Sequence, residues 1–146
     1  MNKSIMRVTI CFIIFFNIFF LLMPQAQEII PESQMVKNLI LCKDIENNEP
    51  VMETDSFNTW DEKAVAWIQF NHETDSPFVV SWEWVDPTGK IYHIGQLEMD
   101  AGIYQNYRSW YWISIKEHYA TNITGNWRVR IFIGDDFLAA KNFTIY

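Results

Sequence analysis

The sequence predicts an all-β protein, an antiparallel β-sandwich of about seven strands preceded by an N-terminal signal helix. Apolar segments of strand length recur from Met35 onward at intervals of about 8 to 12 residues, with turn-forming residues between them. Helical periodicity is weak in this part of the chain. Aromatic residues make up 16% of the sequence, which is enough for a substantial core in one small domain.

The first 26 residues have the pattern of a secretory signal peptide. Lys3 and Arg7 precede an apolar run from Val8 to Met23, and Ala26 lies before polar sequence. The run is shorter than the roughly 20 apolar residues of a spanning helix, which favours cleavage. An uncleaved membrane anchor is the alternative, because Pro24 stands where a cut after Ala26 prefers a small residue.

This reading gives the chain three parts: a signal peptide (1–26), a short linker (27–34) and a single domain (35–146). We expect an exported protein, periplasmic or extracellular, that touches a membrane only through the N-terminal segment if that segment is not cleaved. The linker is polar and contains Pro31. No repeats or low-complexity tracts follow it.

The first predicted strand covers residues 35–44. The polar stretch after it, with Asn47, Asn48 and Pro50, is not expected to form regular sheet. In the next loop, Phe57 and Trp60 are expected to pin the chain onto the body of the domain.

The central strands are predicted at residues 64–71, 78–85 and 90–99. The segment from His72 to Pro77 suits a turn between the first two. Pro87 and Gly89 suit a tight turn between the second and third, which makes those two strands antiparallel partners.

The last strands are predicted at residues 106–115, 126–133 and 137–146. The first of them is the most aromatic segment of the chain. In the second, apolar and mostly polar residues alternate, which indicates one core face and one solvent face. Leu138 and Phe143 stand at an odd separation in the third, and a bulge near residues 139–141 would bring them to the same face.

Several short motifs resemble a family of bacterial C-terminal domains of unknown function. That family has the pattern W-x-W/Y, R-x-W-S and G-x-W-R-V, followed by a leucine and F-x-V. The corresponding segments here are Trp82-Glu83-Trp84, Arg108-Ser109-Trp110, Gly125-Asn126-Trp127-Arg128-Val129, Leu138 and Phe143. Tyr111 stands where the family has serine. The resemblance implies an immunoglobulin-like β-sandwich and supplies no activity.

The net charge disfavours two classes of partner, and the cysteine content bears on disulfide formation. The formal net charge of −7 disfavours nucleic acid and anionic lipid surfaces, which need clustered basic residues. Cys42 is the one cysteine of the predicted domain and lies in an apolar run, so a buried, inert thiol is expected. An intermolecular disulfide is the alternative reading of this odd cysteine.

No catalytic, metal or cofactor motif is present. His72, His93 and His118 stand at no metal-ligand spacing, and no nucleophile motif occurs. Asp135 and Asp136 are better explained by a hairpin turn than by calcium. We therefore expect no cofactor and no enzymatic activity, and a hydrolase using His93 or His118 is the least favoured reading.

The aromatic residues exceed what one sandwich face needs. Trp110 and Trp112 share one face of their strand, while Tyr107, Tyr111 and Ile113 share the other, so one group is expected to be exposed or at a sheet edge. Cover by a loop such as residues 56–62 is the alternative. The candidate interaction surface consists of Arg108, Trp110, Trp112, Arg128 and Arg130. These residue types suit a noncatalytic module with a protein partner in the cell envelope, and carbohydrate binding is the alternative.

Overall fold

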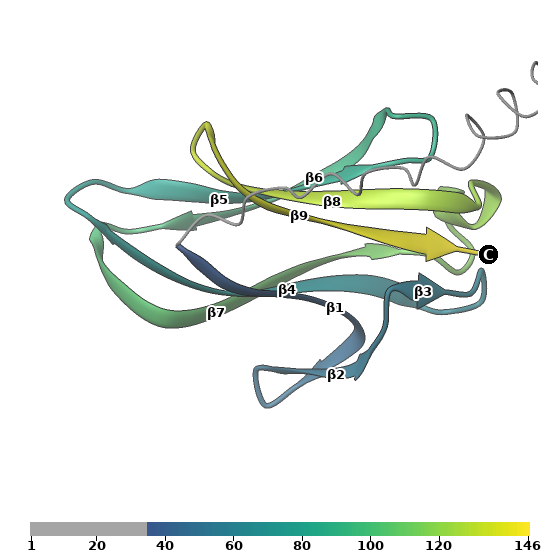
Figure 1. The fold of residues 1–146 in the computed structure, drawn as a ribbon, viewed down its shortest axis with the longest axis horizontal. Helices are drawn as coiled ribbons and strands as arrows, with labels where there is room; N and C mark the ends of the chain where they lie inside the picture. Colours follow the sequence, from purple (N-terminus) through teal and green to yellow (C-terminus); the bar gives the residue numbers. More distant parts are fainter. Residues whose placement is uncertain (1–34) are drawn as a thin grey trace, which may run out of the picture.

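A computed structural model describes residues 35–146, where two β-sheets pack face to face (Figure 1). The signal peptide and linker predicted for residues 1–34 lie outside the described residues. One sheet has the strand order β2-β1-β4-β7, and the other has the order β3-β9-β8-β5-β6. Within residues 35–146 no helix is long and apolar enough to cross a membrane.

Nine strands and one short 3₁₀ helix build the domain. They are β1 (Val36–Glu46), β2 (Glu49–Glu53), β3 (Ser56–Phe57), β4 (Lys63–Thr74), β5 (Phe78–Val85), β6 (Ile91–Met99), β7 (Gly102–Ser114), η1 (Tyr119–Asn122), β8 (Gly125–Ile133) and β9 (Asp136–Ile145). The seven predicted strands are all present. β2 and β3 were not predicted.

The connectivity is that of an immunoglobulin-like sandwich. Strands β1, β4 and β7 form one sheet in the positions of immunoglobulin strands A, B and E, while β5, β8 and β9 take the positions of C, F and G in the other. Every strand pair is antiparallel except the short pair of β3 with β9. The predicted all-β, immunoglobulin-like fold is confirmed.

The core between the sheets is rich in tryptophan. Trp82 and Trp84 of β5 and Trp127 of β8 are at most 1% exposed. Trp84 and Trp127 both contact Phe143 of β9, with ring centroids 5.7 and 6.0 Å apart. Because each large aromatic side chain buries an area of about 150–250 Å², these residues supply much of the stability that a domain without a disulfide needs.

A glycine in β6 lets the two sheets approach at one edge. A Cβ atom on Gly95 would lie 2.3 Å from the ring of Tyr111, which belongs to β7 in the opposite sheet. The Tyr111 ring also lies 6.0 Å from that of Trp82. The Tyr111 ring therefore occupies the space that a side chain at position 95 would need, which is why glycine is required there.

The polar stretch after β1 is a β-hairpin, so the prediction of irregular structure there was wrong. Asn47 and Asn48 have φ angles of 52° and 65°, as the two central residues of a type I′ turn require. They join β1 to β2, with Glu46 opposite Glu49. Pro50 is tolerated because β2 is an edge strand, where the backbone N–H that proline lacks is not needed to bind a neighbouring strand.

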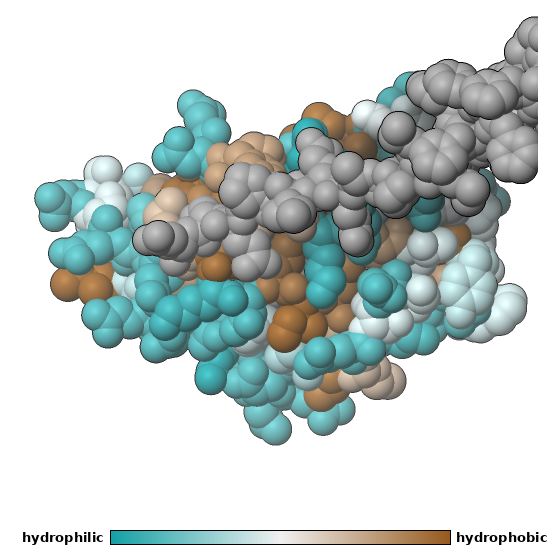
Figure 2. All heavy atoms as spheres, viewed as in Figure 1, coloured by the Kyte–Doolittle hydropathy of each residue, from teal (hydrophilic) through white to brown (hydrophobic). Residues whose placement is uncertain are grey.

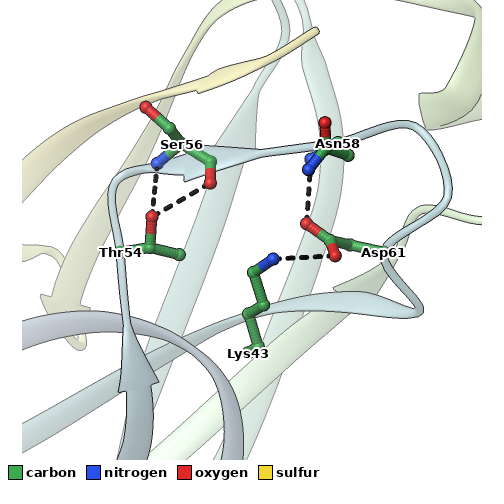
Figure 3. Close-up of polar contacts among 5 residues, drawn as sticks. All are labelled: Lys43, Thr54, Ser56, Asn58 and Asp61. Atoms are coloured by element: carbon green, nitrogen blue, oxygen red, sulfur yellow. Dashed lines mark hydrogen bonds and ion pairs between the residues drawn. The ribbon is translucent and has the colours of Figure 1, made fainter.

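The segment from residue 54 to residue 61 carries the chain from one sheet to the other and is held by short polar contacts (Figure 3). The hydroxyl of Thr54 accepts a hydrogen bond from the backbone N–H of Ser56 at 3.1 Å. Asp61 accepts one from the N–H of Asn58 at 2.8 Å and pairs with Lys43, also at 2.8 Å. Backbone hydrogen bonds from Thr144 to Asp55 and from Tyr146 to Phe57 then hold the short β3 strand beside β9.

The two aromatic residues expected to pin this segment behave differently. Phe57 is fully buried, and its ring packs edge-on against Phe143 at 5.7 Å. Trp60 is 71% exposed, so the prediction was right for Phe57 and wrong for Trp60. The turn containing Trp60 leaves its ring in solvent.

A bulge in β9 brings Leu138 and Phe143 to the same side, as predicted. Ile131 of β8 pairs with Ala139 and Phe132 pairs with Phe137, which leaves Leu138 as the extra residue. Leu138 and Phe143 are both buried. The bulge thus lies one residue before the predicted position.

Candidate functional site

Three of the predicted surface residues lie together on the outer face of the four-stranded sheet. Arg108, Trp110 and Trp112 alternate along β7 with Ser109, Tyr111 and Ile113, whose side chains point toward the opposite sheet. Trp110 is half-buried, and Trp112 is 47% exposed. Trp110 and Trp112 are thus the outward-facing aromatic residues of this strand.

The β1–β2 hairpin folds over this outer face. In Figure 1, β2 lies below the layer formed by β1, β4 and β7, on the side away from the five-stranded sheet. Trp67 of β4 donates a hydrogen bond from its indole N–H to the carbonyl of Asn48 at 3.0 Å. Arg108 of β7 reaches Glu49 at 2.9 Å. Figure 2 shows mainly hydrophilic side chains on this lower side of the molecule.

The hairpin creates a second, smaller buried region outside the main core. Cys42 of β1 and Val65 and Trp67 of β4 lie on the outer face, yet each is at most 3% exposed. Burial raises the pKa of the Cys42 thiol to about 11. The thiol is therefore protonated at neutral pH, as expected for an inert cysteine.

A cavity of about 350 Å³ opens between the hairpin turn and the two tryptophans of β7. We call it the tryptophan cavity. It is lined by Asp44, Ile45, Asn47, Asn48, Lys63, Val65, Trp110 and Trp112. Apolar ring faces thus lie beside a carboxylate, an ammonium group and two amides, a combination that can hold one small polar ligand with an apolar side.

The two charged residues of the tryptophan cavity neutralise each other. Lys63 donates to the carboxylate of Asp44 at 2.7 Å, and its ammonium lies 5.9 Å from the centre of the Trp112 ring. The hydrogen bond from Lys63 lowers the pKa of Asp44 below its ordinary value, and the backbone N–H of Ile45 acts in the same direction. Asp44 is therefore an ionised acceptor at neutral pH.

β7 is an edge strand, and its outward-facing backbone groups belong to the residues that also carry the outward side chains. It pairs only with β4 among the described strands. The N–H of Ile115 donates to Glu62, and in an antiparallel pair alternate residues direct both backbone groups at the partner. The register then directs the backbone groups of Arg108, Trp110 and Trp112, together with those of Ser114, away from β4.

Arg128 and Arg130 lie on the opposite outer face of the domain. Both belong to β8, where they alternate with the core residues Val129 and Ile131. Arg130 pairs with Glu83 at 2.6 Å, and Arg128 donates to Asn142 at 2.8 Å. The structure therefore does not join all five predicted residues into one surface.

The histidines do not converge on one site. His93 of β6 lies 3.3 Å from the hydroxyl of Tyr111, His72 packs against Phe78, and His118 precedes η1. Across residues 35–146 no three His, Cys, Asp or Glu side chains are grouped closely enough to hold a metal ion. The tryptophan cavity contains no histidine or cysteine.

The fold places this domain among immunoglobulin-like β-sandwich proteins. No protein-family model matches the chain, and no curated protein matches its sequence. A solved immunoglobulin-like protein from Pseudomonas aeruginosa is 19% identical over 80% of this chain and 98% of its own, with a TM-score of 0.47.

Two further solved structures have a similar shape. The alkylpurine DNA glycosylase AlkC from Pseudomonas fluorescens, solved with DNA containing an abasic-site analogue, is 14% identical over 77% of this chain, with a TM-score of 0.50. The likeness covers only 30% of AlkC. The soluble domain of PmoD from Methylocystis is 11% identical over 77% of this chain and 97% of its own, with a TM-score of 0.38. At these identities the likeness concerns the fold alone.

The sequence analysis did not identify the residues that line the tryptophan cavity opposite Trp110 and Trp112. Asp44, Asn47, Asn48 and Lys63 were not singled out as surface residues. The Asn47-Asn48 pair carried a usable signal, because consecutive asparagines tolerate positive φ and favour a two-residue hairpin turn. The position of this hairpin over Trp67 depends on tertiary contacts and has no local sequence signal.

Proposed function

We propose that this chain is an exported, noncatalytic interaction module that binds a protein partner in the cell envelope. The binding element in this proposal is the β7 edge, which we define as residues 107–114. Its side chains include Trp110 and Trp112, residues of the type that dominate binding energy in protein interfaces. The signal-peptide pattern of residues 1–26 supports export.

The observation that carries the proposal is that the β7 edge lacks most of the features that protect edge strands from pairing. Natural edge strands are blunted by lysine, proline, bulges or extreme shortness. Residues 107–114 contain no lysine and no proline, and their register with β4 is regular. The bulge of this strand lies before them, between the pairs of Phe70 and His72. The one charged residue, Arg108, is engaged by Glu49.

This geometry fits binding by strand addition. An extended segment of the partner would pair with the outward backbone groups of Arg108, Trp110, Trp112 and Ser114. Main-chain hydrogen bonds would supply affinity, and the flanking rings would select side chains of the incoming strand. Tyr107 and Trp112, which are 39% and 47% exposed, are the accessible aromatic anchors.

The noncatalytic part of the proposal rests on the chemistry of the described site. The tryptophan cavity holds an acid paired with a lysine but offers no nucleophile with an adjacent base. The Trp82, Trp110 and Trp127 motifs resemble bacterial C-terminal domains of unknown function, a resemblance that supplies no activity, and membership of that family is part of the proposal.

Capture from envelope extracts tests the proposal. Tagged wild-type protein is compared with Ser114→Pro, which removes one outward N–H, and with Ser114→Ala, which keeps it. A third variant carries Trp110→Ala and Trp112→Ala. Each variant is first shown by circular dichroism to remain folded. We expect a partner that wild type and Ser114→Ala retain and that the other two variants lose.

Two results would contradict this function. Equal capture of the same proteins by all four folded forms would show that the β7 edge does not bind them. Recovery of no partner after crosslinking in intact cells would count against a protein-binding role altogether.

A further inference from the structure

We propose that the tryptophan cavity is a carbohydrate subsite that takes one neutral sugar unit of a glycan. A pyranose ring has an apolar face of C–H groups and a rim of hydroxyls. The cavity offers the matching surfaces: the Trp112 ring, and polar groups of Asp44, Asn47 and Asn48 around it. This inference goes beyond the protein-binding role, which uses the outward backbone groups of the β7 edge and shares only the Trp110 and Trp112 rings with the cavity.

The size of the cavity suits a single small ligand. Its volume of about 350 Å³ lies near the lower end of the roughly 300–1,000 Å³ found for ligand pockets. Trp112 is 47% exposed, so part of its ring is available for stacking. Its contacts with Tyr111, at 5.7 Å between ring centroids, and with Lys63 hold the ring in place. The electron-rich ring face attracts the weakly positive C–H groups of a sugar.

The backbone of the polar rim is held in place, and its side-chain amides have free hydrogen-bonding capacity. The type I′ turn fixes the backbone of Asn47 and Asn48, and the Trp67 indole ties the turn to the sheet at 3.0 Å. Within residues 35–146 the side-chain amides of Asn47 and Asn48 make no hydrogen bond. Each amide can both donate and accept, as recognition of a hydroxyl requires. Because the turn backbone is already fixed, binding has to order only the two amide side chains, which lowers the entropy lost on binding.

The charge of the site favours a neutral ligand. Asp44 and Lys63 are the two charged residues of the lining, and they pair at 2.7 Å. No unpaired lysine or arginine remains in the cavity to attract an acidic sugar, and the whole chain has a net charge of −7. Acidic glycans are therefore disfavoured.

Two assays on protein purified from cells expressing the full chain test this inference. A glycan array with neutral hexose and N-acetylhexosamine chains, and with acidic glycans for comparison, identifies the class of ligand. Titration calorimetry with chitohexaose, cellohexaose and maltohexaose then measures affinity. Trp112→Ala removes the stacking face. Asn47→Gly with Asn48→Gly removes the amides and keeps a turn that allows positive φ. Trp60→Ala is the matched control, because Trp60 is 71% exposed and lies outside the cavity.

We expect at least one neutral glycan to bind. Trp112→Ala and the double glycine variant should each weaken its binding by about tenfold or more, whereas Trp60→Ala should leave it unchanged. No binding to any neutral glycan, stronger binding of acidic glycans, or an affinity unaffected by Trp112→Ala would overturn the inference. Ser114→Pro separates the two roles: it should keep glycan binding and lose the protein partner.

Discussion

Arg108 and Glu49 form an ion pair of 2.9 Å although the strands that carry them, β7 and β2, lie at opposite edges of the four-stranded sheet. Two strands separate them in the sheet. The contact exists because β1 leaves β4 after the pair of Cys42 with Val65 and curls outward with β2. The hairpin thereby covers Trp67 and forms one wall of the tryptophan cavity.

The hairpin is expected to depend more on the Trp67 hydrogen bond than on this ion pair. Glu49→Ala should lower the free energy of unfolding by about 0–1 kcal/mol, because both partners are nearly half exposed and solvent screens them. Trp67→Phe should cost about 1–3 kcal/mol, since it leaves the Asn48 carbonyl without its donor. Urea denaturation measures both values, and a larger loss for Glu49→Ala would refute this order.

The core tryptophans and the surface tryptophans should differ sharply in their effect on stability. Trp82→Ala should lower the free energy of unfolding by about 3–5 kcal/mol, because its side chain is fully buried. Trp60→Ala and Trp112→Ala should each cost less than about 1 kcal/mol, because their rings are 71% and 47% exposed. The same denaturation assay compares the three variants. Similar small losses at all three positions would contradict the observed core.

Gly95 should tolerate no side chain while Tyr111 is present. Gly95→Ala places a methyl group 2.3 Å from the Tyr111 ring and should cost about 1–3 kcal/mol. Combining it with Tyr111→Ala should cost less than the sum of the single changes, because the clash is gone. Gly102→Ala is the control, since the nearest atom there lies 3.7 Å away. Additive losses at positions 95 and 111 would show that the two residues are not coupled.

The buried thiol of Cys42 should make stability fall in alkaline solution. Its pKa is raised from 9.0 to about 11 by burial, so folding favours the protonated form. This contribution is fully present below about pH 9 and is lost as the pH rises toward 11, where the unfolded chain has already released its proton.

Comparison with Cys42→Ala isolates this effect from other groups that titrate in the same range. The difference in unfolding free energy between wild type and the variant should shrink between pH 8 and pH 11 as the advantage of the protonated thiol is lost. Denaturant titrations at both pH values give the difference. A difference that does not change with pH would mean that the thiol is not buried in solution.

Regular strands could be predicted well because their signals are local. The predicted bounds of residues 78–85 coincide with β5, since the turns at Pro77 and Pro87 limit the strand on both sides. Alternation also showed that Trp110 and Trp112 share one face of their strand, although it did not show whether that face points outward. The β1–β2 hairpin was missed because Pro50 excludes a central strand, whereas an edge strand accepts it.

The grouping of the candidate residues could not be predicted from the sequence. Alternation places Arg130 on a solvent face, but it does not say which sheet carries that face. Pairing of Arg130 with Glu83 of β5 puts it on the five-stranded sheet, far from Arg108 in the fold. Trp60 was wrongly predicted for a similar reason. The sequence shows a large aromatic residue in a loop, but only the tertiary structure shows that its ring is exposed and not packed on the domain.

The position of β9 determines the order in which the strands of the five-stranded sheet can pair during folding. β9 lies between β8 and β3, and its buried residues Phe143 and Ile145 contribute to the core. A nascent chain therefore cannot close the five-stranded sheet before residue 145 has left the ribosome, since the tryptophan rings that Phe143 covers stay open to water until then. Closure of the five-stranded sheet is in this sense the last step of folding, because β3 joins that sheet only through β9.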